Sequence, residues 1–320
     1  MSGSDDRSAS GRGDLNRPRN QDAPIRRIAF AGIGNMGWPM AANLVKAGFD
    51  VTVCDAAPGR AEGFAREIGG KAAASPAAAG EGADAIVTIV PTSAQVAQVA
   101  EAVAPSLRAG MLFIDMTSGQ PGRTREIAAR LAECGVAMVD CPVSGGVPRA
   151  KTGQLAIMAG GEAAALDRAE PVLQAMGTSI HRCGGIGAGQ AMKALNNLVS
   201  AGGFLIGVEA LLVGQRFGLD AGTMVDVLNE SSGMNNSTKL KFKQHVLSRR
   251  FESGFSLDLM VKDVGIALEV ARETGTPTPY AALCREIWAA AQAMLEPGQD
   301  HTGMAKLSEK LANEVLGGNK

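Results

Sequence analysis

Short apolar runs alternate with helix-like stretches through the first half of the chain. The runs typical of buried strands are residues 26–31, 49–55, 83–90, 111–115, 136–143, 153–161 and 179–184. Apolar residues at helical spacing separate several of them, at 38–48, 94–103 and 122–134. Repeated alternation of strand and helix predicts an α/β fold with a Rossmann-type, doubly wound and mostly parallel sheet.

The pattern changes near residue 186. Residues 189–217 contain no proline and no strand-like alternation, which predicts one helix about 40 Å long. The remaining chain is typical of helices joined by short loops. We therefore expect a dinucleotide-binding domain at 25–186 and an all-α domain at 187–320. Residues 1–24 are polar and lack the apolar centre of a signal peptide, so they are expected to be a disordered leader.

Composition narrows the function classes. Basic and acidic side chains number 31 and 32, a net charge of −1, which argues against a nucleic-acid or membrane-surface binder. The most apolar later segment, about 194–208, is too short to span a bilayer. The five cysteines show no spacing typical of zinc ligands, so no metal site is expected. Such cysteine usage favours a reducing, cytoplasmic compartment.

A glycine-rich turn follows the first predicted strand, with the sequence Gly32, Ile33, Gly34, Asn35, Met36, Gly37. It matches G-x-G-x-x-G between a strand and a helix, which is the context of a dinucleotide-binding turn. The first glycine permits the tight turn, the second lets the backbone approach a pyrophosphate, and the third allows close helix packing. The helix N-terminus offers unpaired N–H groups to the phosphates.

Asp55 ends the second predicted strand, 18 residues after Gly37. A carboxylate there accepts hydrogen bonds from ribose hydroxyls and repels a 2′-phosphate, which favours NAD over NADP. The alternative is that Asp55 only caps a helix or stabilises a turn. Arg60 is near enough in sequence to keep NADP open.

Oxidation of an alcohol by a nicotinamide cofactor requires a group that accepts the hydroxyl proton. The three histidines lie on a strand, in a basic stretch and in a late loop, settings typical of structural or solvated residues. Lys193 lies near the head of the long predicted helix, and no charged residue follows until Glu209. Partial burial would lower its pKa, and Asn197, one turn later, shares its face. The alternative is that Lys193 only lines the domain junction.

A second polar cluster is CPVSGG at 141–146, which follows a strand end. Ser144 supplies a hydroxyl, and Gly145 and Gly146 can expose backbone N–H groups to a carboxylate. The alternative is an ordinary glycine turn.

Together these segments resemble the β-hydroxyacid dehydrogenase family, which includes 3-hydroxyisobutyrate dehydrogenases and tartronate semialdehyde reductases. The resemblance covers nearly the whole chain after residue 25. It rests on four motifs in order: IAFAGIGNMGWPMAANL, DCPVSGGVPRAKTGQLAIMAGG, GAGQAMKALNN and FSLDLMVKDVGIAL.

The resemblance implies that Lys193 is catalytic with Asn197 beside it, and that Ser144, Gly145 and Gly146 bind the substrate carboxylate. It implies further cofactor contacts from Val90, Pro91, Gln95, Ser118 and Lys262. It also implies a small hydroxy acid as substrate, NAD as the cofactor, and a homodimer or homotetramer. The alternative for Lys262 is an exposed helical ion pair with Asp263.

One departure concerns the segment SSGMNNSTK. Members specific for 3-hydroxyisobutyrate tend to have an aromatic residue shortly after SSG, whereas this chain has Asn235 and Asn236. A more polar site, with Asn236 as a substrate contact, leaves open a tartronate semialdehyde-type reductase and a threonate- or serine-like dehydrogenase. A non-catalytic nucleotide-binding protein and an imine reductase are disfavoured, since Lys193 is present.

Overall fold

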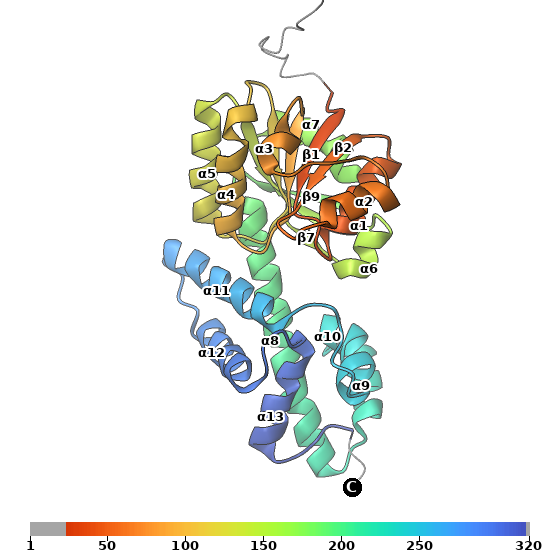
Figure 1. The fold of residues 1–320 in the computed structure, drawn as a ribbon. Coiled ribbons are helices and arrows are strands. Elements are labelled where there is room, and N and C mark those ends of the chain that lie inside the picture. The colour runs from red at the N-terminus through yellow and green to blue at the C-terminus, as the bar shows by residue number, and fades with distance from the viewer. Residues whose placement is uncertain (1–23, 318–320) are drawn as a thin grey trace, which may run out of the picture.

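The computed structural model describes residues 24–317, and their first half forms one sheet (Figure 1). Its strands are β1 (Arg27–Ala31), β2 (Asp50–Cys54), β3 (Lys71–Ala72), β4 (Ala85–Thr88), β5 (Leu112–Asp115), β6 (Ala137–Asp140), β7 (Val143–Ser144), β8 (Leu155–Gly160) and β9 (Gly177–Gly184). The order is β3-β2-β1-β4-β5-β6-β8-β7, with β9 beside β8. The pairs from β3 to β6 are parallel, which confirms the predicted Rossmann-type sheet.

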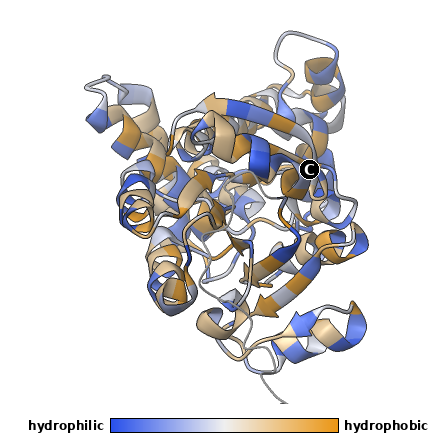
Figure 2. Ribbon diagram, turned by 90° about the horizontal axis from the view of Figure 1, so that it is seen from above, coloured by the Kyte–Doolittle hydropathy of each residue, from blue (hydrophilic) through white to orange (hydrophobic). Residues whose placement is uncertain are grey.

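Helices cover both faces of this sheet: α1 (Gly37–Lys46), α2 (Arg60–Glu67), α3 (Pro76–Gly80), α4 (Ser93–Val103), α5 (Pro121–Glu133), α6 (Gly146–Lys151) and α7 (Ala163–Gln174). Along β1, Ile28 and Phe30 belong to one buried cluster, while Ala29 and Ala31 belong to another. Successive side chains of a strand point to opposite faces, so the sheet is buried on both sides. In Figure 2 the helices carry both hydrophobic and hydrophilic residues.

The predicted strand at 136–143 is wrong as one element. It ends as β6 at Asp140, and the chain resumes at Val143 as β7, which runs antiparallel to β8. Pro142 lies between them and has no N–H for a ladder hydrogen bond, which explains the interruption.

After the sheet the chain is helical: α8 (Ala188–Phe217), α9 (Ala221–Asn229), α10 (Asn236–Leu240), α11 (Leu257–Glu273), α12 (Pro279–Met294) and α13 (Ala305–Ala312). A π-helical turn at Phe242–Leu247 and a 3-10 turn at His301–Met304 complete this half. The long helix is confirmed: α8 has 30 residues and runs from the sheet through the helical half (Figure 1). The exact domain limits stay a prediction, and residues 1–23 of the expected leader lie outside the described residues.

Asp140 fixes the start of α8 to the sheet. Its Oδ1 accepts a hydrogen bond from the Gly187 N–H at 2.7 Å, and its Oδ2 accepts one from the Gln190 N–H at 2.8 Å. A Cβ on Gly189 would lie 2.2 Å from the Met158 carbonyl oxygen, so the helix backbone packs directly on β8. The orientation of the next helical turn is therefore set by the sheet.

The expectation that the apolar segment near 194–208 is too short to span a bilayer is wrong for the helix as a whole, because α8 is long and apolar enough to do so. More than half of its most apolar window, 56%, is buried inside the protein. Phe204, Val208 and Leu211 pack in a cluster with Phe242 and Trp288 of the helical half. The apolar side chains of α8 thus form part of the hydrophobic core of that half.

Candidate active site

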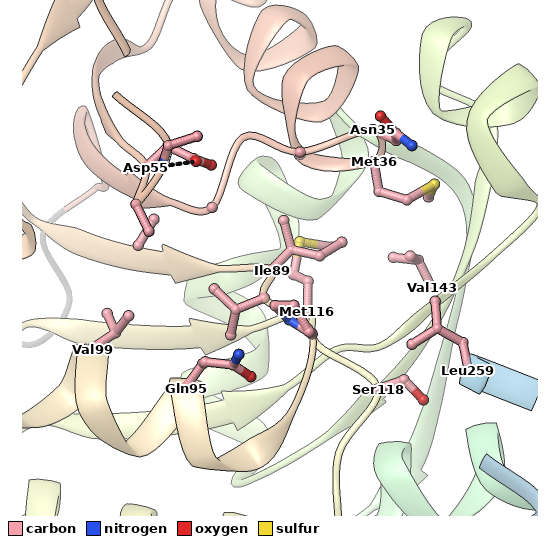
Figure 3. Close-up of a pocket in the computed structure, with 18 of the residues that line it drawn as sticks. Asn35, Met36, Asp55, Ile89, Gln95, Val99, Met116, Ser118, Val143 and Leu259 are labelled. Atoms are coloured by element: carbon pink, nitrogen blue, oxygen red, sulfur yellow. Dashed lines mark hydrogen bonds between the residues drawn. The ribbon is translucent and has the colours of Figure 1, made fainter. Parts of the chain in front are cut away.

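A cavity of about 1040 Å³ lies at the carboxyl ends of β1 and β4. The chain runs from β1 to one side of the sheet through β2 and to the other side through β4, so this is the point where strand order reverses. In Figure 3, Asp55 and Leu259 of α11 lie at opposite ends of the cavity. Both halves of the chain thus contribute to one site.

Most of the predicted site residues line this cavity: Gly32, Gly34, Asn35, Met36, Gly37, Asp55, Val90, Pro91, Gln95, Ser118, Ser144, Gly145, Gly146, Lys193 and Lys262. Three do not. Ile33 is buried beneath the turn, and Asn197 is buried behind Lys193. Asn236 is exposed at the start of α10, so its contact with substrate stays a prediction.

The glycine turn fits a dinucleotide. A Cβ on Gly32 would lie 2.3 Å from the Ile89 carbonyl oxygen. A Cβ on Gly37 would lie 1.9 Å from the Gly32 carbonyl oxygen. Both positions therefore admit no side chain. Gly34 differs, since the nearest atom to its Cβ position is Nη1 of Arg60, 3.9 Å away. Its backbone faces open cavity, which allows a diphosphate to approach the start of α1.

Asp55 is held at the edge of the cavity by two backbone groups (Figure 3). Its Oδ2 accepts a hydrogen bond from the Ile33 N–H and its Oδ1 one from the Ala57 N–H, both at 2.8 Å. The carboxylate is thereby fixed beside the turn, where an adenosine ribose would lie. Arg60, which sequence alone left ambiguous, lines the same cavity on the side of Gly34.

Lys193 is buried on the wall of the cavity, with 8% of its surface exposed. Burial lowers the pKa of its amine; the negative charge of Asp263 opposes this, and the positive charge of Lys262 adds to it. No hydrogen bond or ion pair joins the amine to another of residues 24–317. Lys193 therefore lies at the junction of the two halves with its amine facing the cavity, and its role in proton transfer stays a prediction.

Asp263 is the central residue that sequence reasoning missed. Only 1% of its surface is exposed, and its Oδ2 accepts a hydrogen bond from the Asn197 amide at 2.6 Å. Its Oδ1 accepts one from the Ser118 hydroxyl at 2.8 Å. One carboxylate on α11 therefore joins α8 to the loop after β5. The ion pair considered for Lys262 and Asp263 is present, but it is not exposed, because Asp263 is buried.

Lys262 crosses from α11 to the sheet half. Its Nζ donates to the Ser118 carbonyl at 2.5 Å and to the Pro91 carbonyl at 3.2 Å. It lies 3.2 Å from Oδ1 of Asp263. The ammonium is thus placed over the loops that follow β4 and β5.

Gln190 is a second residue that sequence reasoning missed. Its Oε1 accepts from the Gly119 N–H at 2.7 Å, and its Nε2 donates to the Thr117 carbonyl at 2.7 Å. Nε2 also lies 3.3 Å from Oδ2 of Asp115, a carboxyl whose pKa burial raises to about 6. Gln190 precedes Lys193 by one helical turn. Its position in the sequence GQAMK is the feature from which its role could have been predicted.

The loop of Ser144 reaches the cavity from β7. Ser144 pairs with Ala156 of β8, and Gly145 and Gly146 follow with φ of 128° and 65°. Residues with side chains rarely adopt such angles, so the two glycines permit the turn. The Cβ position of Gly146 is open, with Pro148 3.7 Å away, whereas the Arg149 side chain lies 2.5 Å from the Cβ position of Gly145.

Asn235, which the sequence predicts to make the substrate site more polar, has a structural role. Its side chain accepts hydrogen bonds from the N–H groups of Ser237 at 2.8 Å and Thr238 at 3.2 Å, which caps α10. It also donates to the Gly203 carbonyl at 3.4 Å. This asparagine fixes α10 against α8 and does not line the cavity.

Comparison with known proteins decides the family. A family model described as the NAD binding domain of 6-phosphogluconate dehydrogenase matches residues 27–185. A second, described as NAD-binding of NADP-dependent 3-hydroxyisobutyrate dehydrogenase, matches 187–308. The chain is 34% identical to 2-(hydroxymethyl)glutarate dehydrogenase of Eubacterium barkeri, over 92% of this chain and 98% of that one. It belongs to the β-hydroxyacid dehydrogenase family.

Two further relatives agree. NAD-dependent L-serine dehydrogenase of Pseudomonas aeruginosa is 34% identical over 82% of this chain and 91% of that one. The solved structure of Mycobacterium tuberculosis 3-hydroxyisobutyrate dehydrogenase with L-serine has a TM-score of 0.81 and 35% identity, covering 88% of this chain and 98% of that one. The predicted class, a hydroxy-acid dehydrogenase that uses a nicotinamide cofactor, is confirmed.

Proposed function

We propose that the protein oxidises a β-hydroxy acid with Lys193 as the group that accepts the hydroxyl proton. The observation that carries the proposal is one cavity lined by the glycine turn, the Ser144 loop and a buried lysine whose pKa is lowered. A nicotinamide bound there would supply the hydride acceptor. Proton transfer is left to the protein. Two lysines line the cavity, and Lys193 is the buried one, whereas the Lys262 ammonium is bound by backbone carbonyls and Asp263.

Each residue then has a physical task. The Ser144 hydroxyl and the N–H groups of Gly145 and Gly146 bind the substrate carboxylate. Asn197, held by Asp263, lies one helical turn from Lys193 and orients its amine from behind. Lys193 accepts the hydroxyl proton during oxidation and returns it during reduction. Fixed geometry matters, since misplacement by about 1 Å costs about 100-fold in rate.

NAD is the proposed cofactor over NADP. Asp55 carries a negative charge at the edge of the cavity, and a 2′-phosphate on the ribose would meet that charge. Arg60 lies on the side of Gly34, where it can pair with the diphosphate that both cofactors share.

The proposed substrate is a β-hydroxy acid resembling 3-hydroxyisobutyrate, with an aldehyde-acid reductase of the tartronate semialdehyde type as the alternative. The test is NADH formation with 3-hydroxyisobutyrate, L-serine, threonate, glycerate and 2-(hydroxymethyl)glutarate, with NADP alongside. Turnover of at least one acid supports the proposal. Failure with all of them, while NADH still binds, contradicts it.

The role of Lys193 has its own test. Lys193→Ala should lower kcat by about 100- to 10,000-fold, the usual worth of a proton-transfer group, and leave NADH affinity nearly intact. Methylamine added to the variant should restore part of the rate. Lys151→Ala, which changes an exposed lysine of α6, is the control. Equal loss of NADH binding would contradict the assignment.

We also propose a homo-oligomer that pairs through α8. The helix exposes an apolar stripe that includes Val199 at 76%, Val213 at 70% and Phe217 at 84% exposure. Large exposed apolar stripes mark protein interfaces, and a second copy offers the same stripe. Val213→Glu should convert the assembly to monomers in light scattering, and an unchanged mass would contradict this interface.

A further inference from the structure

The side chain of Gln190 contacts the loop after β5 at two points. Its Oε1 accepts a hydrogen bond from the Gly119 N–H, and its Nε2 donates one to the Thr117 carbonyl, both at 2.7 Å. These two backbone groups flank Ser118. One amide therefore pairs with the chain on both sides of Ser118, in the manner of a neighbouring strand. A single side chain thus fixes the peptide units before and after Ser118.

The two contacts are buried and directional. Gln190 has 1% of its surface exposed, and its Nε2 also lies 3.3 Å from Oδ2 of Asp115. The amide nitrogen faces two acceptors and the amide oxygen faces a donor, so only one orientation of the amide satisfies all of them. A Cβ on Gly119 would lie 2.5 Å from the Ser93 hydroxyl oxygen, so the loop is closely packed on the side away from the amide as well.

Gln190 itself does not line the cavity, and hydrogen bonds connect it to residues that do. Ser118 lines the cavity, and its carbonyl accepts a hydrogen bond from Lys262 at 2.5 Å (Figure 3). The Thr117 hydroxyl accepts one from the N–H of Val90, another lining residue, at 3.1 Å. The amide is thereby joined to the loops that follow both β4 and β5.

The backbone of the same residue belongs to the first turns of α8. Gln190 precedes Lys193 by three residues, so the two lie on one face of the helix, about 4.5 Å apart along its axis. Asp140 fixes this backbone to β6 through the Gln190 N–H. The side chain adds a separate connection, from the helix to the Ser118 loop. One helical turn and one amide therefore set the distance between Lys193 and Ser118.

We propose that Gln190 is a positioning residue for the reaction, whose amide holds the Ser118 loop at a fixed place relative to Lys193. The inference rests on the proposed function, because it takes Lys193 as the proton acceptor and the loops after β4 and β5 as the place of the nicotinamide. Hydride leaves the carbinol carbon for the nicotinamide, and the proton leaves the hydroxyl for Lys193. Both acceptors must be aligned with one substrate at once, so a loop that moves relative to the helix lowers the rate.

The first variant is Gln190→Met, which keeps the length of the side chain and removes its hydrogen bonds. We expect kcat for hydroxy-acid oxidation to fall by about 100-fold, because the two acceptors lose their fixed alignment. The affinity for NADH should stay nearly intact, since the glycine turn and Asp55 lie at the other end of the cavity. An unchanged kcat would overturn the proposal.

A matched control lies on the same helix. The Gln215 amide, near the end of α8, donates to the Val315 carbonyl at 2.8 Å and accepts from the Gly317 N–H at 3.0 Å. It therefore makes the same kind of double contact, far from the cavity. Gln190→Met and Gln215→Met should both lower the melting temperature, but only Gln190→Met should lower kcat. An equal fall of kcat in both variants would mean that Gln190 acts on stability alone, and would overturn the proposal.

Gln190→Glu gives a pH profile that a loss of stability would not produce. The new carboxyl donates to the Thr117 carbonyl only while it is protonated, and once ionised it faces that carbonyl and Asp115 with no hydrogen to donate. Burial and the negative charges of Asp115 and Asp140 should raise its pKa. The ratio of kcat in the variant to kcat in the wild type cancels the titration of Lys193, and it should fall as pH rises. A flat ratio, measured below the melting temperature at every pH, would contradict the role. This variant also replaces Gln190→Met if that fails to fold.

Hydrogen exchange of the Gly119 amide, measured by NMR on the NADH complex, needs no turnover and separates this inference from the proposed function. Gln190→Met should speed the exchange by about tenfold or more, because the amide loses its acceptor. If exchange becomes faster while the wild type oxidises none of the acids, the hold of Gln190 on the loop stands and the proposed function fails. Unchanged exchange, or faster exchange with an unchanged kcat, overturns the inference and leaves the proposed function intact.

Discussion

The Asn197 amide donates a 2.6 Å hydrogen bond to the carboxylate of Asp263, which joins α8 to α11 directly behind Lys193. Both side chains are almost fully buried. A charged acceptor in such a place makes a strong hydrogen bond, and removing it leaves buried donors unpaired. The carboxylate therefore sets the position of Asn197. Its negative charge also offsets part of the lowering that burial causes in the pKa of Lys193.

We expect Asp263→Ala to lower kcat by about 100-fold, because Asn197 and Ser118 lose their common acceptor. Removing the negative charge should also lower the pKa of Lys193 further, so the pH profile of hydroxy-acid oxidation should shift to lower pH. The measurement is kcat/KM against pH. Asp258→Ala, an exposed acid on the first turn of the same helix, is the control. A lower kcat with no shift of the profile would mean that Asp263 acts on geometry alone.

The sequence predicted the sheet, the long helix and most cavity residues because these depend on local patterns. The turn at Gly32 to Gly37 is read from three glycines at fixed spacing, and burial on both faces appears as continuous apolar runs. The bridging residues depend on contacts between distant parts of the chain. Asp263 contacts Ser118 across 145 positions, and no spacing in the sequence reveals that. In the same way, an asparagine pair gives no sign that Asn235 caps a helix.

The pH dependence of the wild-type enzyme tests Lys193 itself. Oxidation needs the neutral amine, so kcat/KM should rise with pH and level off above the pKa of Lys193. Burial lowers that pKa, so the inflection should lie below 10.5, the ordinary value for lysine. For reduction, the protonated amine is needed and the rate should fall through the same inflection. A rate of oxidation that falls with rising pH would contradict the assignment.

Two glycines of the cofactor turn should respond differently to alanine. Gly34→Ala places a methyl group in open cavity, so the melting temperature should stay close to wild type while NADH affinity falls by at least tenfold. Gly37→Ala places a methyl group 1.9 Å from the Gly32 carbonyl oxygen, so the melting temperature should fall by several degrees. Thermal denaturation and NADH titration of both variants check this. Similar losses of stability in both would contradict the open face of Gly34.

Asp55 and Arg60 should affect cofactor choice in different ways. Asp55→Asn removes the charge that would repel a 2′-phosphate, so the ratio of kcat/KM for NAD over NADP should fall by about tenfold or more. Arg60→Ala should weaken both cofactors by similar factors if it pairs with the shared diphosphate. Asp50→Asn, at the exposed start of β2, is the control and should alter neither. A fall in NADP use alone with Arg60→Ala would place that arginine at the ribose instead.

His301 should make the stability of the helical half depend on pH. Its ring is buried against Trp288 and Phe204, and burial lowers its pKa from 6.5 to about 4. Nδ1 lies 3.1 Å from the Phe255 carbonyl, and Nε2 has no partner among the described residues. Protonation would therefore bury an N–H that has no acceptor.

Between pH 6.5 and 4 the unfolded chain binds a proton at His301 that the folded protein does not bind. The contribution of His301 to the free energy of unfolding should thus be constant above pH 6.5 and fall by roughly 3 kcal/mol towards pH 4. Urea denaturation of His301→Leu should show a weaker dependence across this range, whereas His181→Gln, an exposed histidine on β9, should retain the wild-type slope. A histidine buried in its neutral form predicts a steeper pH dependence in the wild type than in His301→Leu. Equal slopes in the two proteins would therefore assign the pH dependence of stability to other groups.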